Sequence, residues 1–441
     1  MGRFTILVGL PGSGKSYTAK MKALDLARSG RKILWITFLR EERYSLRSFF
    51  IRQGVTADVL IPKYKICPYM AELAGMDARL YLAAGHILCQ ACRHRDKCPR
   101  KRHIREVIES NDVIIGSPAD IALALIYDFD FIVVDEFDSL FPDMLVVEVP
   151  KKLYEAFRGL LAQFNEDLAR ELDKRSIDLG DRRAFPNTVY YTALRYLGYN
   201  TYFISATFNI DPYSEEADVF FWTNIIELEE NNQIVVLPPP QRNDIFMTSV
   251  KKLYAMAPGH VKLYYYLGVA RAVKQLYREH TVTVLARSKA EAKTIHHFLK
   301  KHGVPALTEG VNWLELGQWR SWRVRVLVIG GRFHRSLNMD SDYTIAFYQH
   351  PRPNFWDYYR IRYKYIARHC LECHNILIHR PHVQTLFRSI RDWRKPHKVI
   401  LLDNSWTDSF YYYPHIWEYV RPRRRTFDPD LDKVEDVILT V

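Results

Sequence analysis

A glycine-rich segment near the start of the chain limits the folds that this sequence can adopt. A short β-rich run, residues 4–9, leads into G-L-P-G-S-G-K-S, and apolar residues at helical spacing follow. In this pattern the glycines let successive backbone N–H groups surround nucleotide phosphates, lysine reaches the β and γ phosphates, and serine ligates Mg²⁺. The sequence therefore predicts a strand, a phosphate loop and a helix, with nucleotide contacts from Gly9, Gly12, Ser13, Gly14, Lys15 and Ser16.

A second strand is expected to end at the acidic residues that a phosphate loop requires. Residues 131–134 are apolar, and Asp135 and Glu136 follow them. Because Mg²⁺ needs a carboxylate held rigidly opposite the loop, Asp135 is predicted to hold the ion through its water shell. Glu136 is predicted to orient or deprotonate the attacking water. Alone, the segment also fits a strand that ends in solvated acids; paired with the loop, it favours hydrolysis of a nucleotide.

The charge of the chain narrows the range of partners. Lysine and arginine exceed the acidic residues by 63 to 50, a formal charge of +13 over 441 residues, so the chain attracts polyanions such as nucleic acid. No stretch approaches the ~18 apolar residues that span a bilayer, and no export signal precedes the first strand. We expect an intracellular protein that is cytoplasmic, or nuclear if the source is a eukaryote. We expect no membrane partner.

Later motifs extend the pattern to a second domain. Ser205, Ala206 and Thr207 follow a strand-like run and resemble motif III of superfamily 2 helicases. Three prolines at 238–240 are the strongest break in the chain, and strand-like runs beyond them begin at residues 281, 324, 343 and 398. The boundary between two α/β domains is therefore predicted at these prolines.

The second half of the chain resembles the XPD and DinG family of iron–sulfur helicases. Residues 330–338 are similar to motif V, although Ser336 and Asn338 replace the usual glycine and aspartate. Residues 384–391 fit motif VI, Q-x-x-G-R-x-x-R, with Phe387 in place of glycine. On a helix the two arginines of this motif would be neighbours; a solvated basic helix face is the alternative.

The resemblance assigns a role to each matched residue. The motif VI residues Gln384, Arg388 and Arg391 would take part in catalysis. They would act together with Lys15, Asp135 and Glu136. The two arginines would reach the γ phosphate from the second domain, as an arginine finger. A second set would couple hydrolysis to domain motion; its members are Ser205, Ala206, Thr207, Gly331 and Asn338.

Four of the six cysteines lie between the phosphate loop and the acidic pair. Their spacing is C-x21-C-x2-C-x5-C, at Cys67, Cys89, Cys92 and Cys98. Four thiolates suit either tetrahedral Zn²⁺ or a [4Fe–4S] cluster, which spacing does not separate. The resemblance implies the cluster, and the prolines after Cys67 and Cys98 are typical of ferredoxin-type ligation. Zinc and free thiols stay open, and the pair Cys370 and Cys373 is interpreted as thiols.

Basic residues around these cysteines are predicted to contact nucleic-acid phosphates, the alternative being counter-charge for an anionic cluster. They are Arg93, Arg95, Lys97, Arg100, Lys101 and Arg102. Aromatic and basic residues are mixed at Trp313, Trp319-Arg320 and Trp322-Arg323. Such rings are able to stack on bases, although aromatic residues at this spacing more often belong to the core.

Together these features predict an α/β protein with two RecA-like parallel-sheet motor domains, residues 1–236 and 241–441, the second ending in a C-terminal tail. The first is expected to carry a four-cysteine cluster lobe at 45–108. Residues 148–200 are expected to form a short helical, Arch-like insertion, because apolar residues recur at helical spacing from Lys151 to Leu172.

The resemblance implies a monomeric ATP-dependent helicase that uses ATP, Mg²⁺ and a [4Fe–4S] cluster and moves 5′ to 3′ on single-stranded or forked DNA. RNA as the track stays open. One alternative is a nucleic-acid-binding module with weak or no ATPase and a structural zinc site. Another is a small-molecule kinase or nucleotide hydrolase, which leaves the cysteines and the later motifs unexplained.

Overall fold

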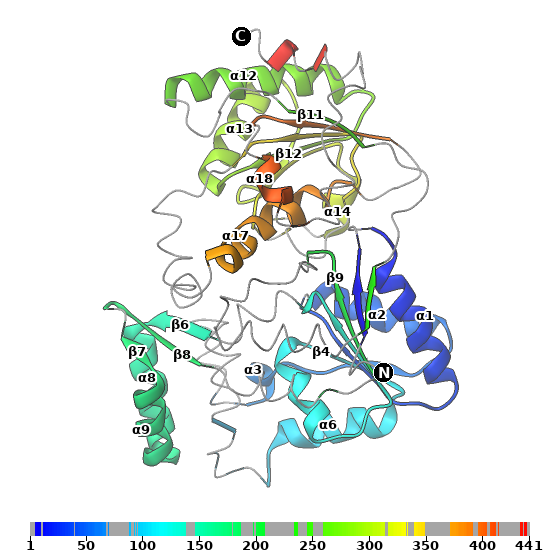
Figure 1. Ribbon diagram of the computed structural model, residues 1–441, viewed down its shortest axis with the longest axis vertical. Coiled ribbons are helices and arrows are strands. Elements are labelled where there is room, and N and C mark those ends of the chain that lie inside the picture. The colour runs from blue at the N-terminus through cyan, green and yellow to red at the C-terminus, as the bar shows by residue number, and fades with distance from the viewer. Residues whose placement is uncertain are drawn as a thin grey trace.

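Two parallel β-sheets, one from each half of the chain, form the body of the molecule (Figure 1). The structure is a computed structural model, and the part of the chain that it describes is residues 5–9, 12–38, 40–67, 69, 88, 89, 92, 94, 96–137, 146–178, 180–186, 197, 200–207, 233–236, 245–249, 259–313, 316–331, 333, 339–348, 371–390, 396–403, 406–411, 413, 433, 434 and 436–438. The expected fold class, α/β with two parallel-sheet domains, is confirmed.

The first sheet has the strand order β10-β1-β9-β5-β2-β4-β3, and every pairing is parallel. Its strands are β1 (Thr5–Val8), β2 (Ile33–Ile36), β3 (Ala57–Val59), β4 (Val113–Gly116), β5 (Phe131–Asp135), β9 (Thr201–Ser205) and β10 (Gln233–Val236). β2, β4 and β5 are buried throughout, which is typical of parallel strands covered on both faces. Because neighbouring strands end at the same level, the residues that follow β1, β5 and β9 meet at one edge.

Helices from the first half pack on this sheet. They are α1 (Lys15–Arg28), α2 (Arg40–Arg52), α3 (Lys63–Ile66) and α6 (Pro99–Ser110), together with the 3-10 helix η1 (Pro118–Leu125). Trp35 of β2 meets Phe50 of α2 edge-on, with ring centroids 6.2 Å apart, and both side chains are fully buried. Apolar burial of this kind holds α2 and the phosphate-loop helix α1 against the sheet.

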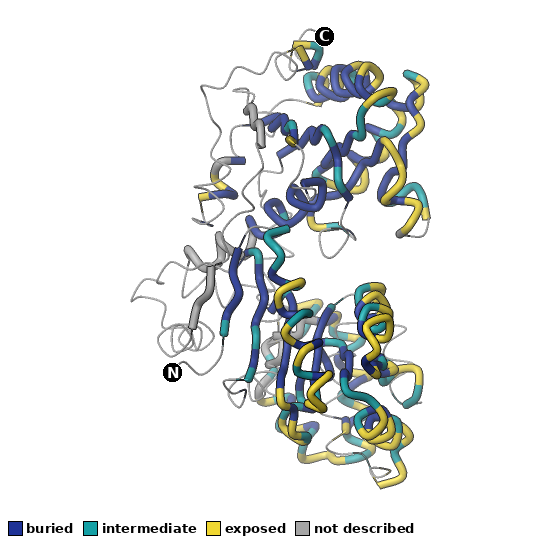
Figure 2. The backbone as a smooth tube through the Cα atoms, turned by 90° about the vertical axis from the view of Figure 1, so that its right-hand side faces the viewer, coloured by how far each residue is buried: buried dark blue, intermediate teal, exposed yellow. Residues whose placement is uncertain are grey.

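The second sheet is also parallel, in the order β11-β16-β15-β12-β14-β13. Its strands are β11 (Ile245–Ser249), β12 (Val282–Ala286), β13 (Leu307–Thr308), β14 (Val324–Val328), β15 (Tyr343–Ala346) and β16 (His397–Leu401). The helices of this half are α12 (Gly259–Leu276), α13 (Lys289–Lys301), α14 (Leu316–Ser321), α17 (Leu371–Leu386) and α18 (Trp406–Tyr411). Separate apolar clusters cover the two faces of the sheet. The tube view shows a largely buried backbone within this half and exposed segments along its outer side (Figure 2).

The segment between β5 and β9 contains a two-helix hairpin, α8 (Lys151–Phe164) and α9 (Glu166–Arg175). A small antiparallel sheet stands beside it, formed by β6 (Val146–Pro150), β7 (Ile177–Asp178) and β8 (Arg182–Pro186). The sequence predicted helical periodicity through this region but not its interruption at Asn165, whose side chain accepts a hydrogen bond from the Leu168 N–H at 3.0 Å and so begins α9.

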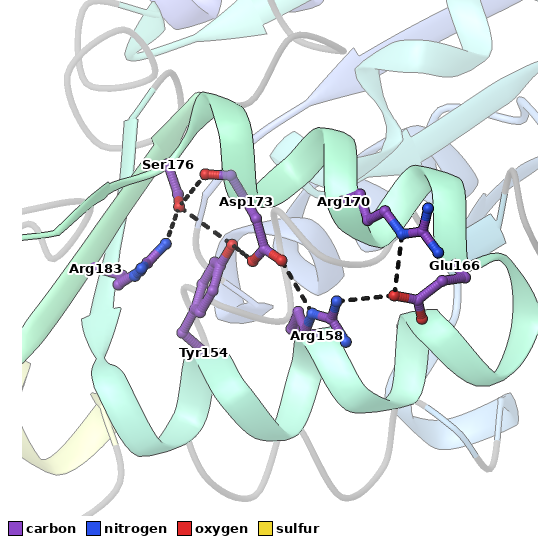
Figure 3. A network of polar contacts seen from close by, with 7 residues as sticks. All are labelled: Tyr154, Arg158, Glu166, Arg170, Asp173, Ser176 and Arg183. Atoms are coloured by element: carbon purple, nitrogen blue, oxygen red, sulfur yellow. Dashed lines mark hydrogen bonds and ion pairs between the residues drawn. The ribbon is translucent and has the colours of Figure 1, made fainter.

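A polar network ties the two hairpin helices together (Figure 3). Asp173 of α9 accepts hydrogen bonds from the Tyr154 hydroxyl at 2.8 Å and from Arg158 Nε at 3.1 Å. Arg158 also donates to Glu166 at 2.9 Å. Beneath the network, the apolar side of the hairpin packs on Leu88 and Cys67, so the cysteine segment and the hairpin share one small core.

Among the described residues, no helix combines the length and apolar character that crossing a membrane requires.

Candidate functional site

The phosphate loop lies at the carboxyl end of β1, directly before α1. Gly12 and Gly14 have φ angles of 90° and 88°, which side-chain-bearing residues rarely adopt. Lys15, only 7% exposed, donates from Nζ to the Gly9 carbonyl at 2.8 Å and approaches Ser13 Oγ at 3.5 Å. Two of the loop residues named from the sequence, Gly9 and Ser13, therefore contact the ammonium group of a third, Lys15.

Ser16 and Asp135 meet at the edge of the first sheet. The Ser16 hydroxyl donates to Asp135 Oδ2 at 3.0 Å, and the carboxylate is almost fully buried. Burial, and then the neighbouring charge of Glu136, raise the pKa of Asp135 to about 6, against the opposing effects of Ser16, Lys20 and Lys15. A hydroxyl and a buried carboxylate are oxygen donors suited to Mg²⁺, so this pair fits the ion.

Glu136 is held in an unusual backbone conformation. Its φ of 53° makes it the one side-chain-bearing residue with positive φ among those described, and its N–H donates to Asp135 Oδ1 at 3.0 Å. Such conformations cost energy and occur often at functional sites. This conformation presents the Glu136 carboxylate to the second half of the chain.

Arg388 of the second half pairs with that carboxylate. Its Nη2 donates to Glu136 Oε1 at 2.5 Å, and the two side chains are 7% and 21% exposed. The motif was predicted to place Arg388 on a helix, and this was wrong: α17 ends at Leu386, and Arg388 lies in the turn that follows. Arg391 lies outside the described residues.

A second contact joins the same two regions. Gln384 of α17 donates from Nε2 to Thr207 Oγ1 at 3.1 Å, in a buried position. The Thr207 N–H in turn donates to Ser205 Oγ at 3.0 Å, and Ala206 between them is half-buried. Motif VI therefore contacts the ends of both β5 and β9.

Glu42, in the first turn of α2, is a third carboxylate close to this edge, and the sequence reasoning missed it. The Thr37 hydroxyl, at the end of β2, donates to Glu42 Oε2 at 2.6 Å. Burial, and then the charges of Asp135 and Glu136, raise the pKa of Glu42 to about 7, against the opposing effects of Thr37 and Arg388. The signal was present, since Thr37 follows a buried strand just as Asp135 does.

In the second half, Gly331 follows β14 and lies against Glu309. A Cβ at Gly331 would clash with the Glu309 carboxylate, so no side chain fits there unless Glu309 moves. Glu309 is itself buried and accepts the Val328 N–H at 2.8 Å. Asn338, the other motif V residue named from the sequence, lies outside the described residues.

The cysteines contrast with this edge. Cys67 ends α3 and Cys98 precedes α6, while Cys89 is exposed and Cys92 is half-buried. All four belong to the described residues, and within that set no three His, Cys, Asp or Glu side chains lie close enough to hold a metal ion. The expected four-thiolate ligand set is therefore not assembled in the described part of the chain.

One of the basic residues predicted to contact nucleic acid has a different role. Arg100 is 4% exposed and donates to Asp120 Oδ1 at 2.5 Å, so it is a buried partner in an ion pair. Asp120 Oδ2 also accepts the N–H and hydroxyl of Ser117, which begins η1. Lys97, Lys101 and Arg102 are exposed, whereas Arg93 and Arg95, like Cys370, lie outside the described residues.

Comparison with known proteins finds likeness in structure. No protein-family model matches the chain, and no curated protein matches it. Xpd4 from S. tokodaii superimposes with a TM-score of 0.56 at 14% identity, over 93% of this chain and 94% of that one. An XPD helicase structure gives 0.57 at 14% identity, over 95% of each chain. Dbp5 of S. cerevisiae, in a structure bound to RNA and ADP BeF3, superimposes with a TM-score of 0.50 at 12% identity. The match covers 99% of this chain and 89% of Dbp5. The chain has the fold of the XPD helicases.

Proposed function

We propose that this protein is an ATP-dependent nucleic-acid helicase or translocase of superfamily 2, similar to XPD. The observation that carries the proposal is the ion pair between Glu136 and Arg388. It brings together the acidic residue after β5 and motif VI, which the sequence had assigned separately to one hydrolysis site. The XPD-like fold supports the same reading.

In this mechanism the phosphate loop and Lys15 bind the β and γ phosphates, and Ser16 and Asp135 hold the Mg²⁺ that accompanies ATP. The ion would neutralise phosphate charge. Glu136 orients the attacking water and accepts its proton. Arg388 leaves Glu136 and moves to the γ phosphate, where its charge stabilises the transition state.

Hydrolysis is coupled to motion through the contacts between the halves. When ATP is bound, Arg388 is attracted to phosphate; once phosphate leaves, Glu136 is its nearest anion again. Gln384 and Thr207 extend the same junction to β9. Each turnover thereby alternates the partners of one arginine, which moves the second sheet relative to the first.

The finer features of the proposal rest on the sequence resemblance. They are single-stranded or forked DNA as the track, 5′ to 3′ movement, and a [4Fe–4S] cluster on Cys67, Cys89, Cys92 and Cys98. Motor domains at 1–236 and 241–441, with a cluster lobe at 45–108 and an insertion at 148–200, belong to the same proposal. RNA is the alternative track, since Dbp5 shares the fold with RNA bound.

A nucleic-acid-binding module with weak ATPase is the second candidate. It is favoured by Phe387, which stands where motif VI has glycine and is fully buried in the core of the second half. This candidate predicts ATP turnover that nucleic acid does not change.

The proposal is tested by ATP hydrolysis with and without single-stranded DNA or RNA. Lys15→Ala should lose ATP binding and turnover, and Glu136→Gln should bind ATP but hydrolyse it at least about 100-fold more slowly. Lys22→Ala, exposed on the same helix as Lys15, is the matched control and should behave as wild type. Full turnover in Glu136→Gln contradicts the assignment. Forked substrates with 5′ or 3′ tails then measure direction.

A further inference from the structure

Three tryptophans that stand close together in the sequence occupy different environments. Trp319 is 1% exposed and packs against Phe333, with ring centroids 4.6 Å apart. Trp322 precedes β14 and donates from its indole N–H to the Pro305 carbonyl, which precedes β13, at 3.3 Å. Trp313 follows β13 and is 78% exposed, more than any other large hydrophobic side chain in the described part of the chain. Trp313 thus lies at the carboxyl edge of the second sheet, where its strands end, and Trp322 lies at the amino edge, where they begin.

The turn that carries Trp313 is held firmly to that sheet. Thr308 donates its N–H to the Asn312 side chain at 2.8 Å, and the Asn312 N–H donates back to the Thr308 carbonyl at 2.9 Å. Glu309 bonds to β14 through its own N–H, to the Val326 carbonyl at 2.9 Å, and through its carboxylate. Because Glu309 also abuts Gly331, the turn lies beside the motif V segment.

A cationic side chain from another element lies against this turn. Lys289, the first residue of α13, is exposed, and its side-chain carbons come within 3.4–3.6 Å of the Cβ position at Gly310. An ammonium group and a large exposed ring are therefore presented by one rigid edge of a chain with a net charge of +13. Rings that stack on bases and cations that follow phosphates are the combination that binds single-stranded nucleic acid.

We propose that Trp313 is a stacking platform for one base of a single-stranded nucleic acid, with Lys289 on an adjacent phosphate. The inference rests on the proposed function and adds to it a contact point on the second domain. Because Trp313 is tied through Glu309 to the Gly331 segment, the platform moves with the second domain during each cycle. Stacking accepts any base, which suits movement along a strand.

The test measures binding of fluorescently labelled dT and rU oligonucleotides to the full chain by anisotropy. Trp313→Ala should weaken binding about 10-fold, and Trp313→Phe, which keeps a ring, should restore most of the affinity. Lys289→Ala should weaken binding and reduce the slope of log affinity against log salt by about one, whereas Trp313→Ala should leave that slope unchanged. Trp322→Ala, on the other edge, is the control and should bind as wild type.

The outcomes separate the inference from the proposed function. If wild type binds neither oligonucleotide, the proposed function fails. If wild type binds and Trp313→Ala binds equally well, Trp313 is not the platform, while the helicase proposal stands. If Trp313→Ala instead abolishes self-association in sedimentation and leaves oligonucleotide affinity unchanged, the exposed ring serves a second copy of the chain and the inference is overturned. The ratio of dT to rU affinity shows which track is preferred.

Discussion

The edge of the first sheet and the cysteine segment were both identified from short motifs, yet the structure treats them differently. At the sheet edge, Ser16 meets Asp135 and Glu136 meets Arg388. In the cysteine segment, no three candidate ligands among the described residues come together. The difference lies in what carries the motif: parallel strands fix the positions of the residues that follow them, whereas three of the four cysteines lie outside helices and strands.

The largest effect is expected from removing Arg388, which completes the site at the edge of the first sheet. Arg388→Ala should lower kcat about 1,000-fold, because an arginine finger contributes on that scale, while ATP affinity changes far less. Arg320→Ala, exposed on α14, is the control and should retain turnover. A kcat within threefold of wild type would show that the pair with Glu136 is structural.

The next largest effect is expected from breaking the contact that connects the cysteine segment to the first sheet. The buried pair of Arg100 and Asp120 ties the start of α6, directly after Cys98, to the segment following β4. Asp120→Ala leaves a buried guanidinium without its partner and should cost about 3–5 kcal/mol in urea unfolding. Arg170→Ala, in an exposed ion pair of the hairpin, should cost less than about 1 kcal/mol. Equal costs would mean that the buried pair does not anchor the segment.

A smaller effect comes from the crowding of carboxylates at the sheet edge. Folding raises the pKa of Glu42 from its ordinary 4.5 to about 7, so the folded state holds this proton more tightly than the unfolded state. That contribution to stability is present at low pH and is lost as the pH rises from about 4.5 to about 7. Glu42→Gln keeps an acceptor for Thr37 without the charge, and should be about 1 kcal/mol more stable than wild type at pH 8.

Urea unfolding without nucleotide, at pH 5 and pH 8, measures this effect. The difference between Glu42→Gln and wild type should grow with pH. A difference that is constant across the two conditions would place Glu42 outside the charge cluster formed with Asp135 and Glu136.

The smallest expected effect is that of the cysteines on nucleotide binding. Cys92→Ser should lose the iron measured after anaerobic purification, as expected for a four-cysteine cluster, yet change ATP affinity by less than about twofold, because strands position the ATP site. Cys370→Ser is the control and should keep wild-type metal content. If Cys92→Ser lost ATP binding together with its metal, the contrast would not hold. The sheet edge and the cysteine segment would then form one structural unit.

Prediction from sequence succeeded where a motif stands at the end of a strand. The runs before Gly9 and Asp135 indicated β1 and β5, and their order in a parallel sheet brought Ser16 and Asp135 together. Prediction failed where tertiary contacts determine whether a side chain is buried or exposed. Nothing local shows that Arg100 is buried, because its neighbours in the sequence are exposed cations.

Residues distant in the chain were the hardest to place. Arg388 lies past the end of α17, so the helical spacing that suggested its role was not the reason that it reaches Glu136. Glu42 was overlooked because no short motif contains it. Its importance comes from two carboxylates that are remote in sequence and near in space.

The position of β1 in its sheet has a consequence for biosynthesis. β1 lies between β9 and β10, so that Ile6 pairs with Phe203 on one side and Ile234 on the other. At the usual rate of translation, these partners leave the ribosome roughly 10–50 s after β1. Until then the phosphate loop belongs to a strand without neighbours. A nascent chain stalled before Thr201, where β9 begins, should therefore be a client for chaperones and unable to bind ATP.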